Sequence, residues 1–504
     1  MKQKGTLRLI RIFFAGFFFI GITLLLLDTS GVLYRYLSWI AKLQFLPAVL
    51  AVNLSIVLPL LALTLLFGRF YCSTLCPLGV WQDVVSHCAN KQTPHRFRYS
   101  HNKKWLRLFF LCVALVGIFS SLNILLSLLA PYSIWGRIVT HLFQPLWGYL
   151  TQLISHIEQH FDLYYTFPRE VYLKSLVGLI SSLFFLLIIS LLAWKKGRVW
   201  CNEVCPVGTV LGYTAKFALF KPSIDYKKCI GCKKCERNCK ASCINIKAHK
   251  VDYSRCVDCF NCLAQCPVGA ISYTSTWKIK PQKQSDTASK PDIKRRALLT
   301  SLAVALPAQA LAQKVDGGLT LLEKKKTPER KVMPIPAGSV SIDNMEKRCT
   351  ACGLCVSKCP AQVLKPSTEL HNLMQTTMTF DKGYCRPECT VCSQVCPTGA
   401  ILKITPEEKS AVHIGHAVWI KESCLPFAEG ESCGNCARHC PVGAIRMVKI
   451  SDSGLSGKGA PDENLRIPLV NESRCIGCGA CEHYCPTRPL SSIYVEGHLQ
   501  HRID

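Results

Sequence analysis

The stretch CVDCFNCLAQCPVGAI, residues 256–271, carries the pattern that decides how this part of the chain folds. Its four cysteines are separated by two, two and three residues, and a proline follows the last one. Tight reverse turns between such cysteines present three sulfurs to one centre, and the proline turns the chain away. Because thiolates are soft, anionic ligands for iron, this spacing indicates [4Fe-4S] clusters.

A matching motif lies just upstream, so residues 221–280 predict an α+β ferredoxin-like domain with two clusters. In such a domain the fourth cysteine of each motif binds the cluster of the other motif. Cys239 is followed by Lys240 where a proline is usual, and Cys243 is expected to be a buried bystander. The expected ligand sets are Cys229, Cys232, Cys235 with Cys266, and Cys256, Cys259, Cys262 with Cys239.

Residues 346–504 contain four more motifs and predict a four-cluster ferredoxin domain, which brings the expected total to six clusters. In every motif the last cysteine precedes a proline, and the first gap of the second and third motifs is widened. The motifs are Cys349, Cys352, Cys355, Cys359; Cys385, Cys389, Cys392, Cys396; Cys424, Cys433, Cys436, Cys440; and Cys475, Cys478, Cys481, Cys485.

Composition and missing motifs exclude several other classes. Zinc ribbons pair two cysteine doublets, whereas these segments repeat triplets with a distant fourth cysteine. The formal charge of +28 is not organised as a basic stripe interleaved with aromatic residues, so no nucleic-acid partner is expected. Cys-x2-Cys-His, a Rossmann glycine motif and a P-loop are all absent, which excludes c-type haem and bound nucleotide.

The first 220 residues are strongly apolar and predict a membrane domain of four transmembrane helices. Each of four apolar runs can cross a hydrocarbon layer of about 30 Å. Basic residues cluster after the second and fourth runs, so these ends and residues 221–280 are expected in the cytoplasm. The runs are 7–27, 48–67, 106–130 and 171–194, and the basic residues are Lys91, Arg96, Arg98, Lys103, Lys104, Arg107, Lys195, Lys196 and Arg198.

The loop at residues 135–161 mixes apolar residues with histidines and is expected to lie on the outer membrane surface. It contains His141, His156 and His160. His156 and His160, four residues apart, could contact a quinone headgroup or a metal, or could simply be solvated on an interfacial helix.

The linker at residues 281–345 holds Lys294-Arg295-Arg296 followed by an apolar stretch to Ala312, which reads like an internal twin-arginine export signal. A domain that carries preassembled clusters can cross a membrane only in folded form, so the C-terminal domain is expected in the periplasm. Pro307 and the basic residues after the stretch favour the alternative, a segment that does not cross.

Two Cys-x3-Cys-Pro pairs, Cys72 with Cys76 and Cys201 with Cys205, each follow a Gly-Arg dipeptide at the predicted cytoplasmic end of a membrane helix. Duplication of a two-helix unit would explain the repetition and would bring four thiols to one membrane face. They predict an additional redox site, which could be a further cluster, a redox-active dithiol or a quinone contact. Cys88 and Cys112 have no partners at ligand spacing and are expected to be inert.

Residues 1–280 resemble the NapH membrane ferredoxins, and residues 290–490 resemble the exported four-cluster ferredoxins of the MauM/NapG family. The chain therefore looks like a fusion of the two. The resemblance implies a multi-pass protein of the bacterial inner membrane that takes electrons from the quinone pool. It further implies that these electrons are delivered to a periplasmic reductase or its cytochrome, with nitrate reductase the type case.

The resemblance also implies which motifs share clusters in the C-terminal domain. The outer motifs would pair, so that Cys485 completes the set of Cys349 and Cys359 completes the set of Cys475. The inner motifs would pair likewise, with Cys440 joining the Cys385 set and Cys396 joining the Cys424 set.

The pattern as a whole favours an electron relay with no catalytic residues of its own, since many clusters in series suit conduction. Whether the chain counts as a quinol dehydrogenase component or only as an electron carrier stays open at this point. The alternatives are a maturation or reactivation factor for a partner metalloenzyme and a redox sensor, but sensing needs only one labile site.

Overall fold

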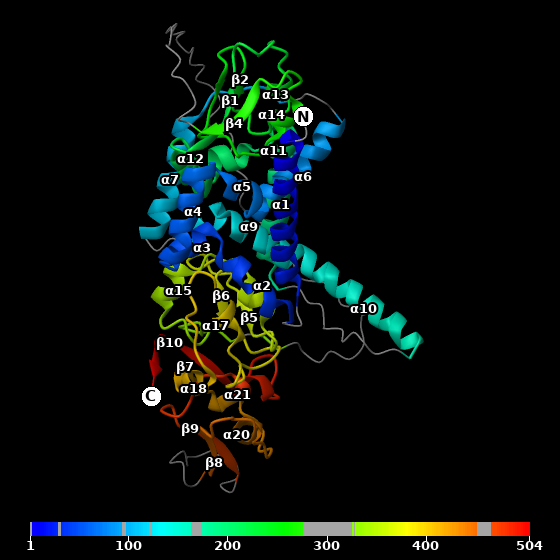
Figure 1. Cartoon of the computed structure of the whole chain (residues 1–504). Helices are drawn as coiled ribbons and strands as arrows, with labels where there is room; N and C mark the ends of the chain where they lie inside the picture. Colours follow the sequence, from blue (N-terminus) through cyan, green and yellow to red (C-terminus); the bar gives the residue numbers. More distant parts are fainter. Residues whose placement is uncertain are drawn as a thin grey trace, which may run out of the picture.

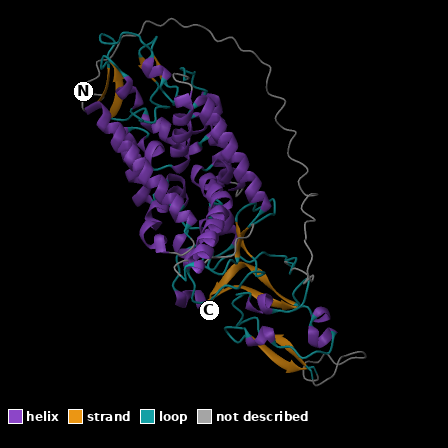
Figure 2. Cartoon of the chain, turned by 90° about the vertical axis from the view of Figure 1, so that its right-hand side faces the viewer, coloured by secondary structure: helices purple, strands orange, loops and turns teal. Residues whose placement is uncertain are grey.

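A computed structural model describes residues 3–28, 32–92, 97–119, 123–162, 174–275, 325–326, 328–450 and 465–503. Helices form the middle of the molecule, and the short strands gather at its two ends (Figure 2). One end is the region 220–275, which contains the first two cysteine motifs, and the opposite end is formed by residues 328–503 (Figure 1). The predicted twin-arginine segment, residues 294–312, falls outside the described residues.

The helical part runs from the N-terminus to residue 215 and includes two π-helical turns, η1 and η2. Its elements are α1 (Gln3–Leu27), α2 (Val32–Lys42), α3 (Phe45–Leu50), α4 (Leu54–Phe67), α5 (Phe70–Thr74), α6 (Pro77–Gln92), α7 (Lys104–Phe119), α8 (Asn123–Leu129), α9 (Pro131–Ile138), η1 (Val139–Phe143), α10 (Gln144–His160), α11 (Leu176–Lys196), η2 (Trp200–Val204) and α12 (Pro206–Ala215).

Two described helices are long and apolar enough to cross a membrane, judged by length and composition: Thr6–Leu27 and Leu176–Lys196. The second predicted run is not a single helix, which corrects the expectation for that run. It is interrupted because Val52 takes a left-handed backbone conformation with φ of 53°, and α4 starts anew at Leu54. Within the third run the structure describes α7 and α8, and residues 120–122 between them fall outside the described residues.

The loop predicted at residues 135–161 is helical. Helix α10 projects away from the other helices (Figure 1) and exposes much of its apolar surface as well as its polar residues. His156 and His160 lie on this helix, whereas His141 is buried on η1, where it packs against Gly178 of α11.

The region that carries the first two motifs is built of two small antiparallel sheets and two short helices. The outer strands of the region pair with each other, since Phe220 lies opposite Ser275 and Ile224 opposite Ile271. Its elements are β1 (Phe220–Ile224), α13 (Lys234–Arg237), β2 (Ile244–Asn245), β3 (Lys250–Val251), α14 (Asn261–Gln265) and β4 (Ile271–Ser275), with β1 paired to β4 and β2 to β3.

Residues 328–503 repeat the same scheme twice, with short helices after the cysteine turns and paired strands around them. The sheets are β5 with β6, β7 with β10, and β8 with β9. The elements are α15 (Ile342–Arg348), α16 (Leu354–Lys358), β5 (Leu364–Pro366), β6 (Thr376–Met378), α17 (Val391–Val395), α18 (Pro406–Ser410), β7 (Val412–Trp419), the 3-10 turn η4 (Lys421–Ser423), α19 (Leu425–Ala428), α20 (Asn435–Arg438), β8 (Ile445–Lys449), β9 (Arg466–Val470), α21 (Ala480–Tyr484) and β10 (Ile493–Ile503).

A buried ion pair fastens the C-terminal region to the far end of α1. The Lys358 ammonium on α16 lies 2.7 Å from the Asp28 carboxylate, and the two side chains are only 1% and 5% exposed. Close by, the backbone of Cys352 packs so tightly on Gly136 that a Cβ there would lie 2.2 Å from the Cys352 carbonyl oxygen. This interface therefore depends on a paired charge and on a glycine.

Replacing Asp28 by Asn should loosen this interface, because it leaves the buried Lys358 ammonium without its counter-charge. Loss of one partner of a buried pair costs about 3 kcal/mol, roughly a hundredfold in the opening equilibrium. Hydrogen-deuterium exchange of the amides of α16 should rise accordingly. Asp343→Asn, which breaks the exposed pair with Lys347, is the matched control and should change exchange little. Equal exchange in the two variants would contradict the role of the Asp28–Lys358 pair in holding this interface.

Candidate iron-sulfur sites

The first two motifs bring their cysteines together around two separate cavities. Cys229, Cys232, Cys235 and Cys266 line one cavity, and Cys239, Cys256, Cys259 and Cys262 line the other. These are the sets that the spacing predicts, although their ligation of iron stays a prediction. Backbone conformation supports each turn, since Lys233 and Phe260, just before α13 and α14, have φ of 57° and 58°.

Cys243 is buried, as predicted, and it lies directly beside the Cys239 set. It is 1% exposed, it lines the same cavity as the Cys239 set, and its sulfur lies 3.5 Å from the Cys239 sulfur. The signal was available in the sequence, because three other motifs continue Cys-Pro-x-Gly-Ala-Ile, and Cys243 occupies the alanine position of that pattern. This thiol is therefore a close neighbour of the ligand set.

In the C-terminal region the motifs pair with their neighbours in the sequence, which corrects the outer-with-outer arrangement. Cys359 lines a cavity together with Cys385, Cys389 and Cys392. A separate cavity is lined by Cys485 together with Cys424, Cys433 and Cys436.

The two remaining sets follow the same rule. Burial raises the pKa of Cys352 to about 12, and the nearby thiol of Cys396 adds to that shift. Burial likewise raises the pKa of Cys478 to about 12, with further contributions from the thiols of Cys475 and Cys440. The remaining sets are Cys349, Cys352, Cys355 with Cys396, and Cys475, Cys478, Cys481 with Cys440.

The physical reason is chain length. Within each neighbouring pair a short helix and two paired strands return the chain to the partner motif, as in residues 221–275. Each half therefore brings two sets of four cysteines together on its own, and the outer motifs do not need to meet across the domain.

The surroundings of these thiols fit [4Fe-4S] clusters. Backbone N–H groups donate to sulfur in the turn after the proline: Ala270 to Cys266 and Ala444 to Cys440, both at 3.2 Å. Donors of this kind, in an apolar shell, stabilise and tune clusters. Among the described residues no group of three or more His, Cys, Asp or Glu side chains is placed to hold a single metal ion.

The two Cys-x3-Cys-Pro pairs also meet, and they form one buried group of four thiols. Cys72, Cys76, Cys201 and Cys205 are each 3–4% exposed and lie within range of one another's charge. Gln82 of the first repeat donates to the sulfur of Cys201 in the second at 3.2 Å.

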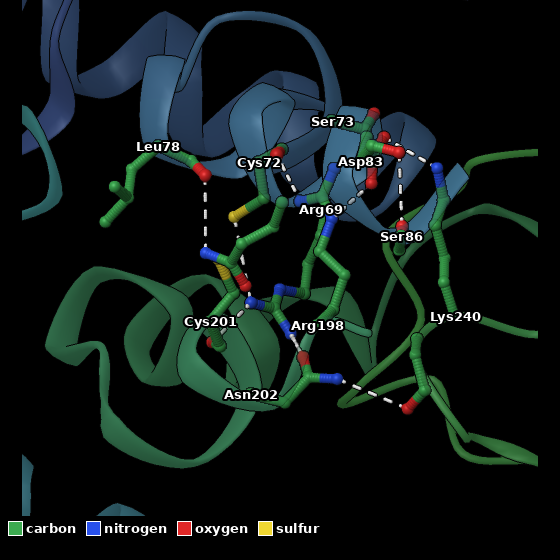
Figure 3. Close-up of polar contacts among 12 residues, drawn as sticks. Arg69, Cys72, Ser73, Leu78, Asp83, Ser86, Arg198, Cys201, Asn202 and Lys240 are labelled. Atoms are coloured by element: carbon green, nitrogen blue, oxygen red, sulfur yellow. Dashed lines mark hydrogen bonds and ion pairs between the residues drawn. The ribbon is translucent and has the colours of Figure 1, made fainter. Parts of the chain in front are cut away.

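Arginines exchanged between the repeats hold this group together (Figure 3). Arg69 donates to the Cys201 carbonyl oxygen at 3.1 Å, and Arg198 donates to the Cys72 carbonyl oxygen at 2.6 Å. Gly79 and Gly208 make room for these two contacts. A Cβ at Gly79 would lie 2.3 Å from the Cys72 carbonyl oxygen, and a Cβ at Gly208 would lie 2.1 Å from the Cys201 carbonyl oxygen. Sequence analysis noted the Gly-Arg repeat but missed the role of its arginines.

The charges around the four thiols are unbalanced. Asp83 accepts from three buried cations at once: Arg11 and Arg198 at 2.6 Å and Lys240 at 2.7 Å. Arg69 is fully buried, and its guanidinium has no carboxylate partner within the described part of the chain. Because an uncompensated buried charge costs several kcal/mol, the residues present fit an anionic group at the thiols.

The motif pairing makes a stoichiometric prediction. Cys349→Ala and Cys396→Ala should each remove the same cluster, so either single variant and the double variant all lose about four iron atoms per chain. Cys396→Ala combined with Cys424→Ala should lose about eight. Iron and acid-labile sulfide per chain measure this, and the reverse pattern would support the outer-with-outer arrangement.

Comparison with protein families agrees with these groupings. A family model described as a 4Fe-4S dicluster domain matches residues 228–273, 348–400 and 431–488. Another, described as a 4Fe-4S binding domain, matches residues 49–95 and 178–225, which contain the two Cys-x3-Cys-Pro pairs. The match at residues 348–400 contains two neighbouring motifs, as the structure pairs them.

The curated relatives are ferredoxin-type proteins. The methylamine utilization ferredoxin-type protein MauM of Methylobacillus flagellatus is 32% identical over 178 residues, 33% of this chain and 70% of the relative. MauM of Methylorubrum extorquens is 32% identical over 200 residues, covering 38% and 84%. The ferredoxin-type protein NapG of Escherichia coli is 32% identical over 155 residues, covering 30% and 64%.

No solved structure matches the chain. The similarity to MauM proteins, together with the dicluster matches, settles the family. The chain is an iron-sulfur electron-transfer protein that belongs to the family of MauM and NapG ferredoxin-type proteins.

Proposed function

We propose that this protein relays electrons from membrane quinol, through clusters on both sides of a membrane, to a periplasmic reductase or its cytochrome. The observation that carries the proposal is the placement of the two ferredoxin regions at opposite ends of the helices (Figure 1). Helix α1 contacts both regions. Near the start of the helix, Arg11 pairs with Asp83, which also pairs with Lys240 of the first region. At the end of the helix, Asp28 pairs with Lys358 of the second region.

The separation suits a bilayer. Between Arg11 and Asp28, α1 rises about 25 Å at 1.5 Å per residue, close to the thickness of a hydrocarbon layer of about 30 Å. The basic residues predicted to be cytoplasmic, such as Lys103 and Arg107, lie at the end that carries residues 220–275; Lys103 pairs there with Glu203. This supports a cytoplasmic two-cluster domain, a multi-pass helical domain in the inner membrane and a periplasmic four-cluster domain.

Within this proposal the four buried thiols hold a seventh [4Fe-4S] cluster. Such a cluster with four thiolates carries a charge of about minus two, which balances the excess of buried arginine. One cluster shared between the repeats agrees with a family model that matches each repeat, because each repeat supplies one Cys-x3-Cys-Pro pair, half of the four thiols that a [4Fe-4S] cluster needs. Bound clusters would supply one-electron oxidation and reduction, while Arg69 and Arg198 position the thiol-bearing turns and compensate their charge.

The identity of donor and acceptor follows from the resemblance of residues 1–280 to NapH and of the remainder to the MauM/NapG family. A quinol donor and a periplasmic acceptor suit a chain with one ferredoxin region on each side of a membrane. The proposal therefore treats the chain as a fusion of the two partners, which needs no soluble carrier between them.

Cys201→Ala tests the relay and the shared site together. The variant should lose about four iron atoms per chain. Quinol should then still reduce the inner clusters, while reduction of the outer ones, followed by electron paramagnetic resonance, should slow strongly. Cys112→Ala, which alters an exposed cysteine on α7, is the matched control and should change neither readout.

The two readouts separate the two claims. Full iron content in Cys201→Ala would remove the seventh cluster but leave the relay standing. Unchanged quinol-dependent reduction of the outer clusters in a variant that has lost this iron would show that electrons do not pass through the shared site.

A further inference from the structure

A cavity of about 550 Å³ lies between α1 and α6, at the end of the helices that carries residues 220–275. This volume is typical of sites for small organic ligands. One stripe of α1, from Arg8 to Ile20, and one stripe of α6, from Val80 to Asn90, form its walls. Asn238, Lys240 and Asn261 of the ferredoxin region close one end.

The lining of the cavity is amphipathic. Its apolar part includes Gly16 and Ile20 of α1 and Val80 and Val84 of α6, which belong to the membrane-embedded level of the helices in the proposed topology. Its polar part includes Arg8, His87 and Asn90. A ligand with a polar ring and an apolar tail would satisfy both parts.

The polar part has unused hydrogen-bonding capacity. Within the described residues, Arg8 Nε and Asn90 Oδ1 are buried without a hydrogen-bond partner. The first is a donor and the second an acceptor, and the exposed imidazole of His87 adds a group that can take up a proton. Both Arg8 and Asn90 line the cavity, so its polar part can take a polar ligand.

The cavity lies next to the ligand set of a predicted cluster. Its lining includes Asn238 and Lys240, which flank Cys239, and Asn261, which directly precedes Cys262. A molecule in the cavity is therefore separated from the Cys239 set by these neighbouring residues, a position that suits an electron donor.

We propose that this cavity is the quinol-oxidation site, with the ring at Arg8, His87 and Asn90 and the apolar tail along Gly16 toward the lipid. The proposal rests on the relay function and names where its donor binds. Oxidation of one quinol to quinone breaks two O–H bonds and releases two protons and two electrons. The protons leave through His87 and cytoplasmic water, and the electrons pass singly to the iron-sulfur cluster of the Cys239 set.

An anionic phospholipid is the other amphipathic occupant, and the charges argue against it. Of the three arginine and lysine side chains that line the cavity, Arg11 and Lys240 are already paired with Asp83 at 2.6 and 2.7 Å, which leaves Arg8 alone for a phosphate headgroup. The two hydroxyls of a quinol need one hydrogen-bond acceptor each and no net positive charge. Asn90 and His87 supply the two acceptors.

Gly16 offers a clean way to fill the cavity. A Cβ at Gly16 would meet no atom within 4 Å, so a larger side chain can enter the cavity without a backbone clash. Phe13 is on the same helix but 71% exposed on another face, so Phe13→Trp is the matched control for Gly16→Trp.

The experiment uses the purified full-length chain in lipid nanodiscs and a photoreactive azido-quinone, with labelled peptides identified by mass spectrometry. We expect label on α1 and α6 peptides, reduced about tenfold or more in Gly16→Trp and unchanged in Phe13→Trp. Label on other elements, equal label in Gly16→Trp, or displacement of the label by anionic phospholipid but not by excess quinone would overturn the assignment.

A parallel assay of cluster reduction by quinol keeps this test separate from the proposed function. If quinol reduces the clusters but the label lies elsewhere, the relay stands and the cavity assignment fails. If no quinol reduces any cluster, the relay from quinol itself fails.

Discussion

Each of the two Gly-Arg-x2-Cys repeats donates hydrogen bonds from its arginine to the other repeat, and the rest of the structure is built on this pair of contacts. The Arg69 side chain donates to the Cys201 carbonyl oxygen in the second repeat, and the Arg198 side chain donates to the Cys72 carbonyl oxygen in the first. The same residues anchor the inner ferredoxin region, because the Arg69 backbone N–H donates to Asp258 and the Arg198 backbone N–H donates to the Lys240 carbonyl oxygen. Two helical units and one cluster domain are thereby fixed at a single point.

Rigid docking at both ends matters because electron transfer depends on fixed positions of the redox groups. At the end that carries residues 220–275, Asp83 pairs with three cations, one from α1, one from the turn after α11 and one from the ferredoxin region, and at the opposite end Asp28 binds Lys358. Buried ion pairs add little net stability but impose a single geometry when both partners are satisfied. In the proposed orientation each electron moves outward across the membrane, which an inside-negative potential favours by about 2.3 kcal/mol per 100 mV.

The grouping of the cysteines in residues 221–280 could be predicted from sequence, because turn geometry ties their spacing directly to one chemistry. The partner of each fourth cysteine in the C-terminal region could not, since spacing does not say which motif a turn faces, and Cys359, Cys396, Cys440 and Cys485 were all assigned to the wrong sets. Apolarity outlined the apolar runs but not the break at Val52, where the backbone, not composition, ends the helix. The cavity between α1 and α6 depends on how two helices diverge, which periodicity does not encode.

The proposed relay requires the two ferredoxin regions to lie on opposite sides of the membrane. Protease accessibility of the C-terminal region in intact spheroplasts, compared with lysed cells, measures this placement. We expect residues 328–503 to be cut in intact spheroplasts and residues 220–275 to be cut only after lysis. Protection of both regions until lysis would place every cluster in the cytoplasm and would contradict a relay across the membrane.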